Sequence, residues 1–340
     1  MAHGRARIVQ LHPTLRCNLT CRHCYSSSGP RRHQSLPHDK LSATLADARQ
    51  EDYEVVSISG GEPLLYRDLV PLLAHARALG LTTTVTTNGT LLTERRLSGL
   101  AEHLGLLAIS LDGVPASHDR MRGEGAFARL ERRLPAVRGS GIPFGFIFTL
   151  TQHNLNELTW VLEFCLEEGA RLLQIHPLEA VGRAKQELPS AIPDAQEAAF
   201  AWLRALELQS KAGASLRVQL DLVDYRYIRE RPERVFAGEQ SDASQAPLGE
   251  LLSPLVVETD GTVAPLEYGF DRSLALGNIH TEPLGEMARR WREDGYERFR
   301  MHCRRAIDSL GGERELPLVN WFDVVSGRDA EARAETLPLG

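Results

Sequence analysis

Short apolar runs alternate with longer amphipathic segments through the first half of the 340-residue chain. Runs rich in β-branched and aromatic side chains predict strands, whereas apolar positions three and four residues apart predict helices. The predicted strands are residues 7–11, 55–59, 82–87, 106–111, 143–150 and 171–176. The predicted helices between them are residues 39–50, 67–79, 93–103, 125–139 and 156–168. Such alternation implies right-handed crossovers, a parallel sheet in an α/β fold, and ligands gathered at the carboxyl ends of the strands.

The second half of the chain has a different pattern. A helix is predicted over residues 193–211 and a strand over residues 215–222. Residues 233–254 are polar and rich in turn formers, which predicts a flexible connection. Residues 255–264 predict a β-hairpin around an Asp-Gly turn. The last ~15 residues lack an apolar period and predict a frayed tail.

Composition and charge narrow the class of protein. Hydrophobic residues make up 42% of the chain and charged residues 25%, which is typical of a globular protein. No apolar run reaches the ~18 residues that a membrane span needs, and the N-terminal residues lack the apolar core of a secretory signal. We therefore expect a cytoplasmic protein without a membrane partner. The net charge is −6 and basic residues are mixed with acidic ones, so no nucleic-acid partner is expected.

The five cysteines are unevenly placed: three crowd into eight residues, and two stand alone. They are Cys17, Cys21, Cys24, Cys165 and Cys303. An odd count in a chain without a secretory signal argues against a disulfide framework and favours a metal site or a catalytic thiol. Cys165 lies on the apolar face of a predicted helix, which is typical of a core residue.

The three crowded cysteines follow the first predicted strand with the spacing C-x-x-x-C-x-x-C. Three thiolates on one loop can hold three irons of a cubane and leave the fourth iron open to a ligand. The alternative is a zinc site with His23 as fourth ligand. That alternative is disfavoured because structural zinc usually takes two separated ligand pairs, whereas His23 directly precedes Cys24.

This loop resembles the signature of the radical S-adenosylmethionine (radical SAM) superfamily, C-x-x-x-C-x-aromatic-C. The second predicted strand ends in a segment that is similar to the family's G-G-E-P motif, which contacts the methionine amino group of S-adenosylmethionine (SAM). Its residues are Gly60, Gly61, Glu62 and Pro63. Two glycines let the backbone approach a ligand closely, Glu62 supplies an acceptor, and Pro63 fixes the turn. An ordinary Gly-Gly-Pro turn is the alternative interpretation.

The resemblance implies further cofactor contacts. His23 occupies the aromatic position near the adenine, with Tyr25 two residues on. Asn88, Ser110 and Asp112, at the ends of the third and fourth strands, are candidates for the ribose and the methionine carboxylate. Asn-Gly and Asp-Gly turns would explain the neighbouring glycines equally well.

Arg122 is a further candidate for the cofactor site, because its guanidinium could pair with the methionine carboxylate in a bidentate manner. The alternative is a solvated surface arginine in a chain with many arginines.

The resemblance also implies the fold and the chemistry. Residues 5–185 are expected to form a partial (β/α)6 barrel. A single [4Fe–4S] cluster would receive one electron from a donor such as flavodoxin or ferredoxin. SAM would then be cleaved to a 5′-deoxyadenosyl radical, which abstracts a hydrogen atom from the substrate. The protein orients and shields this chemistry.

The predicted hairpin and residues 276–279 resemble the SPASM/twitch extension of peptide- and natural-product-modifying radical enzymes. Pro265 and Leu266 stand where relatives carry a cysteine, and Cys303 alone remains where they carry several. One thiol cannot hold a cluster that needs about four ligands. We therefore expect residues 255–322 to form a degenerate extension without an auxiliary cluster, residues 186–254 to form the connection, and residues 323–340 to form the tail.

Three residues are candidates for substrate chemistry. His176 and Glu179 lie at the end of the sixth predicted strand, where the pocket of such a fold opens. A satisfied structural histidine is the alternative for His176. Cys303, beside His302, is either a small buried hydrophobe or a thiol that quenches a product radical.

Three function hypotheses remain open at this level. The first is maturation of a ribosomally made peptide, and the second is modification of a small sugar, nucleoside or amino-acid intermediate. The third, from a different class, is a non-catalytic zinc or iron–sulfur binding protein.

Overall fold

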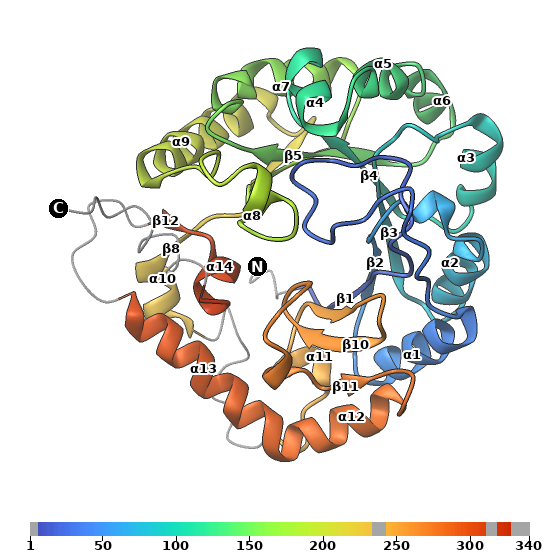
Figure 1. Cartoon of the computed structure of the whole chain (residues 1–340), viewed down its shortest axis with the longest axis vertical. Helices are drawn as coiled ribbons and strands as arrows, with labels where there is room; N and C mark the ends of the chain where they lie inside the picture. The colour runs from blue at the N-terminus through green and yellow to red at the C-terminus, as the bar shows by residue number, and fades with distance from the viewer. Residues whose placement is uncertain (1–5, 233–242, 311–317, 328–340) are drawn as a thin grey trace.

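A computed structural model describes residues 6–232, 243–310 and 318–327. Its main sheet has ten strands in the order β11-β10-β9-β1-β2-β3-β4-β5-β6-β7. The parallel strands of the first part are β1 (Ile8–Leu11), β2 (Val55–Ile58), β3 (Thr82–Thr87), β4 (Leu106–Leu111), β5 (Phe144–Leu150), β6 (Leu172–Pro177) and β7 (Arg217–Leu220). The sheet curves into a partial barrel, and helices form a ring outside it (Figure 1).

The helices of this ring separate the parallel strands in sequence. They are α1 (His38–Gln50), η1 (Pro63–Leu65), α2 (Leu69–Ala78), α3 (Glu94–Leu100), α4 (Pro115–Arg122), α5 (Ala126–Glu131), α6 (Leu134–Gly139), η2 (Leu155–Glu157), α7 (Leu158–Glu167), α8 (Ala184–Glu187) and α9 (Ala195–Ala212). Each of the six strands predicted in the first half is confirmed, with bounds that differ by at most one residue at either end. The expected parallel α/β architecture is confirmed as well.

Two helical features differ from the pattern-based expectation. The helix predicted over residues 125–139 is two helices, α5 and α6, because Pro135 in the first turn of α6 lacks the N–H that a continuous helix would need. Helix α4 was not predicted, because its sequence, PASHDRMR, carries too few apolar residues for a period. Its Pro115 occupies the first turn, where a missing N–H costs nothing.

The second half continues the same ring rather than standing apart from it. Its elements are β8 (Val223–Asp224), α10 (Tyr225–Glu230), α11 (Leu248–Leu251), β9 (Leu255–Val257), β10 (Thr262–Pro265), η4 (Arg272–Leu274), β11 (Gly277–Asn278), α12 (Leu284–Arg290), η5 (Trp291–Gly295), α13 (Tyr296–Ser309), β12 (Leu318–Val319) and α14 (Trp321–Val325). The predicted hairpin is present as β9 and β10, and β9 pairs in parallel with β1. Residues 233–242 of the predicted connection and residues 328–340 of the predicted tail lie outside the described residues.

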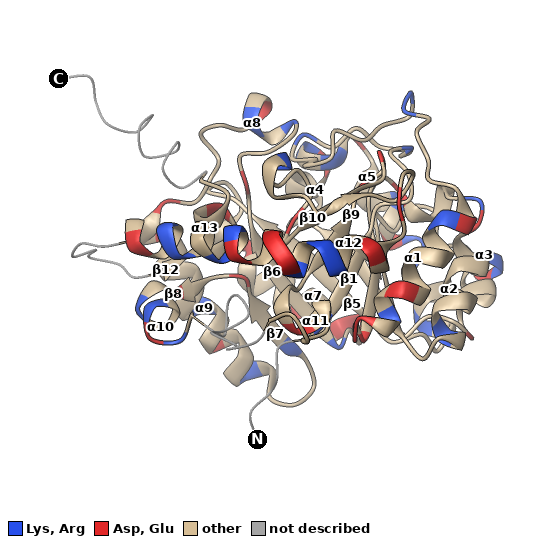
Figure 2. Ribbon diagram, turned by 90° about the horizontal axis from the view of Figure 1, so that it is seen from below, with Lys and Arg blue, Asp and Glu red and all other residues tan. Residues whose placement is uncertain are grey.

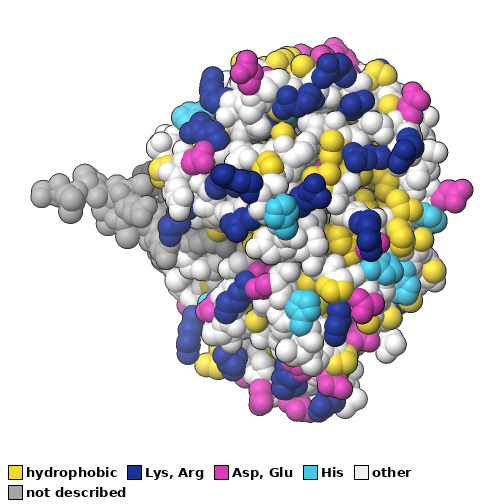
Figure 3. All heavy atoms as spheres, turned by 45° about the vertical axis from the view of Figure 1, so that its right-hand side comes forward, with side chains coloured by type: hydrophobic (Ala, Val, Ile, Leu, Met, Phe, Trp, Pro, Cys, Tyr) yellow, Lys and Arg dark blue, Asp and Glu magenta, His cyan; other side chains and the backbone are white. Residues whose placement is uncertain are grey.

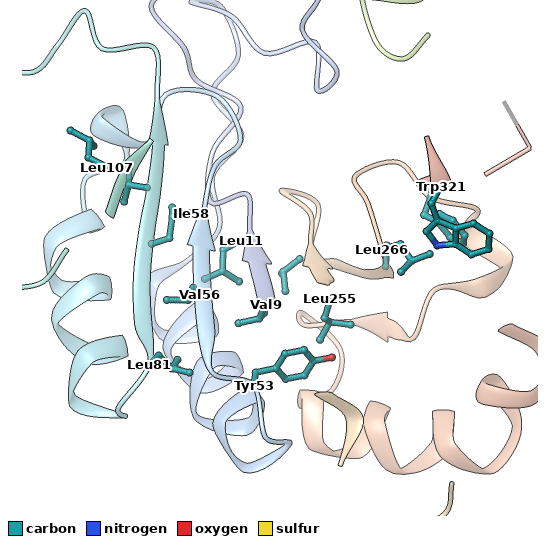
Figure 4. Packing of buried hydrophobic residues seen from close by; sticks show 14 of the residues in the cluster. Val9, Leu11, Tyr53, Val56, Ile58, Leu81, Leu107, Leu255, Leu266 and Trp321 are labelled. Carbon is teal, nitrogen blue, oxygen red and sulfur yellow. The ribbon is translucent and has the colours of Figure 1, made fainter. Parts of the chain in front are cut away.

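One apolar core spans both halves. Val9 and Leu11 of β1 lie between Val56 of β2 and Leu255 of β9, and all four are fully buried (Figure 4). The hydroxyl of Tyr53 donates to the carbonyl of Leu252 at 2.8 Å, which fixes the two halves together at the amino end of the barrel. Burial of each such aliphatic side chain stabilises the fold by about 1.5–3 kcal/mol.

The outer surface carries charges of both signs. Basic and acidic segments follow one another along α12 and α13 (Figure 2), and the face drawn in Figure 3 shows the same mixture. Within the described ranges, the structure contains no helix with the length and apolarity of a membrane span.

Candidate iron–sulfur and cofactor site

The cysteine loop leaves the carboxyl end of β1 and lies against the loop that follows β2. The amide of Gly61 donates to the carbonyl of Thr14 at 2.8 Å, and the amide of Glu62 donates to the carbonyl of Arg16 at 2.9 Å. A Cβ at Gly61 would lie 2.3 Å from the Arg16 carbonyl oxygen, so only glycine permits this contact. The Gly-Gly pair therefore lets the backbone after β2 come close to the backbone of the cysteine loop. The sequence pattern predicted this close approach toward a ligand.

All three cysteines of the loop are free thiols, and polar groups surround their sulfur atoms. The sulfur of Cys17 accepts from the amide of Leu19 at 3.5 Å and from the side chain of Asn88 at 3.9 Å. The sulfur of Cys21 accepts from Arg122 Nη1 at 3.9 Å. Donors directed at sulfur stabilise thiolates, so the donor set fits three ligands of an iron–sulfur cluster.

Burial makes two of these thiols, Cys17 and Cys21, weaker acids in the absence of iron. It raises the pKa of Cys17 to about 12 and the pKa of Cys21 to about 11. Iron binding would displace the thiol protons, because a coordinating thiol is deprotonated. Among the residues that the structure describes, no three His, Cys, Asp or Glu side chains surround the position of a single metal ion. That finding concerns one ion, whereas each thiolate of a cubane binds a different iron.

Glu62 is fully buried between the ends of β2 and β3. Its Oε1 accepts from the hydroxyl of Thr87 at 2.7 Å and from the amide of Leu64 at 3.1 Å, and its Oε2 accepts from the amide of Asn88 at 2.9 Å. Burial raises its pKa. A carboxylate has about four acceptor positions, so one position remains for the amino group that the sequence predicts there.

Asn88 links the end of β3 to the cysteine loop. Its amide nitrogen donates to Asn18 Oδ1 at 3.0 Å as well as to Cys17. Asn18 in turn donates to the hydroxyl of Thr90 at 2.8 Å, and that hydroxyl donates to Asn88 Oδ1 at 2.6 Å. Asn88 therefore contacts the loop that holds the cysteines. Its predicted contact with SAM stays a prediction.

Asp112 and Arg122 form a buried ion pair beside the cysteine loop. Arg122 Nε donates to Asp112 Oδ2 at 2.5 Å, and Nη2 donates to Asp112 Oδ1 at 3.3 Å and to His23 Nε2 at 3.2 Å. Burial alone would raise the pKa of Asp112, but the charge of Arg122 holds it below its ordinary value. Arg122 is 8% exposed, so the alternative of a solvated surface arginine is wrong.

His23 and Tyr25 are both enclosed. Burial lowers the pKa of His23 to about 4, so its ring is neutral. The hydroxyl of Tyr25 lies 3.1 Å from Ser59 Oγ and 3.4 Å from His12 Nδ1, and its ring meets Tyr268 edge to face. The partners Ser59, His12 and Tyr268 were not predicted, because nothing in the local pattern marks them.

His176 and Glu179 lie at the carboxyl end of β6, as predicted, and contact each other; their predicted role toward a substrate stays a prediction. His176 Nε2 lies 3.3 Å from Glu179 Oε1, and Nδ1 lies 3.1 Å from Asp221 Oδ2. Burial would lower the pKa of His176, but the hydrogen bonds to both carboxylates raise it well above 6.5. Asn320, just before α14, donates to Glu179 at 3.0 Å. Asp221 and Asn320 were missed because they lie far away in sequence.

The remaining candidates lie in different surroundings. Ser110 is half-buried near the end of β4. Cys303 is fully buried among Phe299 and Ile307 on α13, a helix on the outside of the ring (Figure 1). This placement fits the interpretation of Cys303 as a small buried hydrophobe.

Arg183, which sequence reasoning missed, contacts the cysteine loop directly. Its Nε donates to the carbonyl of Cys21 at 2.8 Å, and its backbone amide donates to the carbonyl of Cys24 at 3.0 Å. Its Nη2 is buried and has no hydrogen-bond partner.

Comparison with known proteins matches residues 11–165 to the family model of the Radical SAM superfamily. The chain is 27% identical to Fe-coproporphyrin III synthase of Methanosarcina barkeri, over 97% of this chain and 84% of that protein. It is 34% identical to pre-heme d1 synthase of Dinoroseobacter shibae, over 53% and 45% of the two chains. It is 33% identical to AdoMet-dependent heme synthase of Methanosarcina barkeri, over 60% of each. The matched segments thus span less than two thirds of the latter two proteins.

Solved structures share the fold. SuiB of Streptococcus suis bound to S-adenosylmethionine superposes with a TM-score of 0.66 and 18% identity, over 85% of this chain and 66% of SuiB. The enzyme anSMEcpe with bound AdoMet and a Kp18Cys peptide superposes with a TM-score of 0.60 and 20% identity, over 82% and 79% of the chains. At these identities the similarity establishes a common architecture.

Proposed function

We propose that the chain is a radical SAM enzyme that modifies a tetrapyrrole, since residues 11–165 match the radical SAM family model and the chain is similar over 97% of its length to Fe-coproporphyrin III synthase. The family's cofactors are a [4Fe–4S] cluster and SAM. Together they supply one-electron cleavage of SAM and a carbon-centred radical that takes a hydrogen atom from the substrate. The non-catalytic alternative is therefore dropped.

Residues of this chain can hold both cofactors. Cys17, Cys21 and Cys24 would supply one thiolate each, and Glu62 has one acceptor position left for the methionine amine. The buried Asp112–Arg122 pair and the Asn88 network would keep the loop in place around the cluster. The enclosed loop limits solvent access to the site and so restricts side reactions of reactive intermediates.

The tetrapyrrole proposal rests on one observation. The similarity to Fe-coproporphyrin III synthase runs over 97% of this chain, so it includes the C-terminal half as well as the barrel. The C-terminal half contributes side chains, such as Tyr268 and Asn320, to the carboxyl end of the barrel where substrates of this architecture bind. A relative that shares both halves is a better guide to substrate class than one that shares the barrel alone.

The peptide alternative has a different basis. SuiB has also been solved bound to the precursor peptide SuiA, with a TM-score of 0.66 and 17% identity to this chain. That similarity concerns the fold and carries no information on substrate. Peptide maturation and modification of a small sugar, nucleoside or amino acid therefore rank below the tetrapyrrole proposal, which is supported by a similarity over both halves of the chain.

At the substrate side of the site we propose a role for the His176 cluster. The imidazolium is held between Glu179 and Asp221 at the carboxyl end of β6, the end of the strands where ligands of this architecture bind, and its side chain is 34% exposed. It can therefore reach a bound substrate without a change of fold.

The test is substrate-dependent SAM cleavage. The full chain is reconstituted anaerobically with iron and sulfide and incubated with SAM and a low-potential reductant. We expect iron porphyrins with carboxylate side chains to stimulate 5′-deoxyadenosine formation and to change in mass, whereas synthetic peptides do not. Stimulation by peptides and not by porphyrins would overturn the tetrapyrrole proposal.

A further inference from the structure

Two arginines from different parts of the chain flank Cys21. Arg122, at the end of α4, donates to its sulfur at 3.9 Å. Arg183, directly before α8, donates from Nε to its carbonyl oxygen at 2.8 Å. Both positive charges therefore lie next to a residue that binds the cluster.

The charge of Arg122 is partly compensated by Asp112. Asp112 accepts from two of its nitrogens, at 2.5 and 3.3 Å, and Asp112 is fully buried. Asp112 therefore offsets part of the positive potential of Arg122 at Cys21, where the charge of Arg122 still acts more strongly than that of Asp112. His23 and Cys21 take the remaining contacts of the guanidinium.

The charge of Arg183 is not compensated within the part of the chain that the structure describes. No ion pair joins it to an acid there, and its Nη2 is buried without a hydrogen-bond partner. A buried N–H without an acceptor is costly, so such a group points to a ligand that the protein itself does not supply.

The backbone holds Arg183 rigidly against the loop. Gly182 has a φ of +55°, and a Cβ there would lie 2.3 Å from the carbonyl oxygen of Tyr25 and 2.4 Å from that of Cys24. The Arg183 amide donates to the Cys24 carbonyl. The arginine therefore keeps its position relative to the cysteines.

We infer that Arg183 supplies an unpaired positive charge that makes the cluster easier to reduce, in addition to the charge of Arg122, which Asp112 partly offsets. The reduction adds one electron, from a low-potential one-electron reductant, and so adds one negative charge to the cluster. A fixed positive charge nearby stabilises that reduced state, and net charge and hydrogen bonds to sulfur are known determinants of cluster potential. This inference rests on the proposed cluster and is independent of the tetrapyrrole substrate.

The test is a potentiometric titration of the reconstituted full chain, followed by the electron paramagnetic resonance signal of the reduced cluster. We expect Arg183→Gln to shift the midpoint potential to more negative values and Arg183→Lys to retain most of the wild-type potential. Asp112→Asn should shift it to more positive values, because it leaves Arg122 uncompensated. Arg22→Gln is the matched control: Arg22 adjoins Cys21 in sequence but is exposed and paired with Glu187, so no shift is expected.

The outcomes separate the possible failures. An unchanged potential in Arg183→Gln with full iron content would overturn the inference, as would equal shifts in Arg183→Gln and Arg183→Lys, which would indicate a purely structural tether. A shift seen only with SAM present would assign the free Nη2 to the cofactor and also overturn it. Wild-type protein that binds no cluster would instead overturn the proposed function.

Discussion

At the scale of single residues, the side chains proposed to meet the cofactors also hold neighbouring parts of the protein together. Glu62 illustrates this, because the carboxylate expected to meet the SAM amine also accepts hydrogen bonds from Thr87 and Asn88. The motif thus joins neighbouring strand ends. The sequence indicated the ligand role, and the structure adds the bracing role.

Replacement of Glu62 should affect both roles. We expect Glu62→Ala to retain the cluster but to weaken SAM binding by about 10- to 100-fold, since a hydrogen bond to a charged partner contributes roughly 1.5–3 kcal/mol. Equilibrium dialysis with labelled SAM measures the affinity. Thr87→Val, which removes one internal donor to Glu62, should change the affinity much less. An unaltered dissociation constant for Glu62→Ala would contradict its role toward the amine.

At the scale of elements, loops that follow different strands are held together by backbone contacts and buried charge. The loops after β1 and β2 touch through Gly61 and Arg16. The carboxyl end of β6 is tied through His176 to Asp221 and, through Glu179, to Asn320. The first contacts hold the cysteine loop against the end of β2, and the second connect the end of β6 to the segments after β7 and before α14.

A side chain at Gly61 should displace the cysteine loop. Gly61→Ala would place a methyl group 2.3 Å from the Arg16 carbonyl oxygen, and we expect it to destabilise the protein by about 1–3 kcal/mol and to lower iron incorporation. Gly139→Ala, in helix α6 with no atom near its Cβ, is the matched control and should be neutral or slightly stabilising. Chemical denaturation and iron analysis of both variants provide the measurement. Full iron content and wild-type stability in Gly61→Ala would show that the loop has room to move.

The His176 cluster should make stability depend on pH. Because the folded-state pKa of His176 is raised above 6.5, its stabilising contribution is fully present below about pH 6.5 and is lost as the pH rises through the folded-state pKa. We expect the difference in melting temperature between wild type and His176→Gln to be largest near pH 6 and to shrink toward alkaline pH. Asp221→Asn should weaken this pH dependence. A difference that stays constant or grows with pH would contradict the protonated state.

At the scale of the whole molecule, the chain has two further cysteines but one compact set of thiols. Cys165 lies on α7 and Cys303 on α13, two helices in different parts of the ring (Figure 1), and both side chains are fully buried. Burial raises the pKa of Cys165 above its ordinary range. Both thiols therefore have the surroundings of core residues.

The number of clusters follows from this placement. We expect about four irons per chain after full reconstitution, which corresponds to one cubane. The Cys165→Ala/Cys303→Ala double variant should keep the same iron content, whereas Cys17→Ala should lose most of it. Iron and sulfide analysis with absorbance near 400 nm is the measurement. Near eight irons in wild type, reduced to four in the double variant, would reveal an auxiliary cluster.

The amino-acid sequence by itself determined the alternation of strands and helices and the placement of the cysteine loop and the G-G-E-P segment after the first two strands. These features are local, because strand periodicity and ligand spacing are properties of neighbouring residues. Only the tertiary structure decided that β9 pairs with β1, that Asp112 neutralises Arg122, and that Arg183, Asp221 and Asn320 reach the site. Most of these partners lie far apart in the sequence, in several cases by more than 100 residues. The sequence around an isolated arginine or asparagine does not indicate which group it will contact. Their roles follow from how the strand ends converge at one face of the barrel, which no single segment of the sequence specifies.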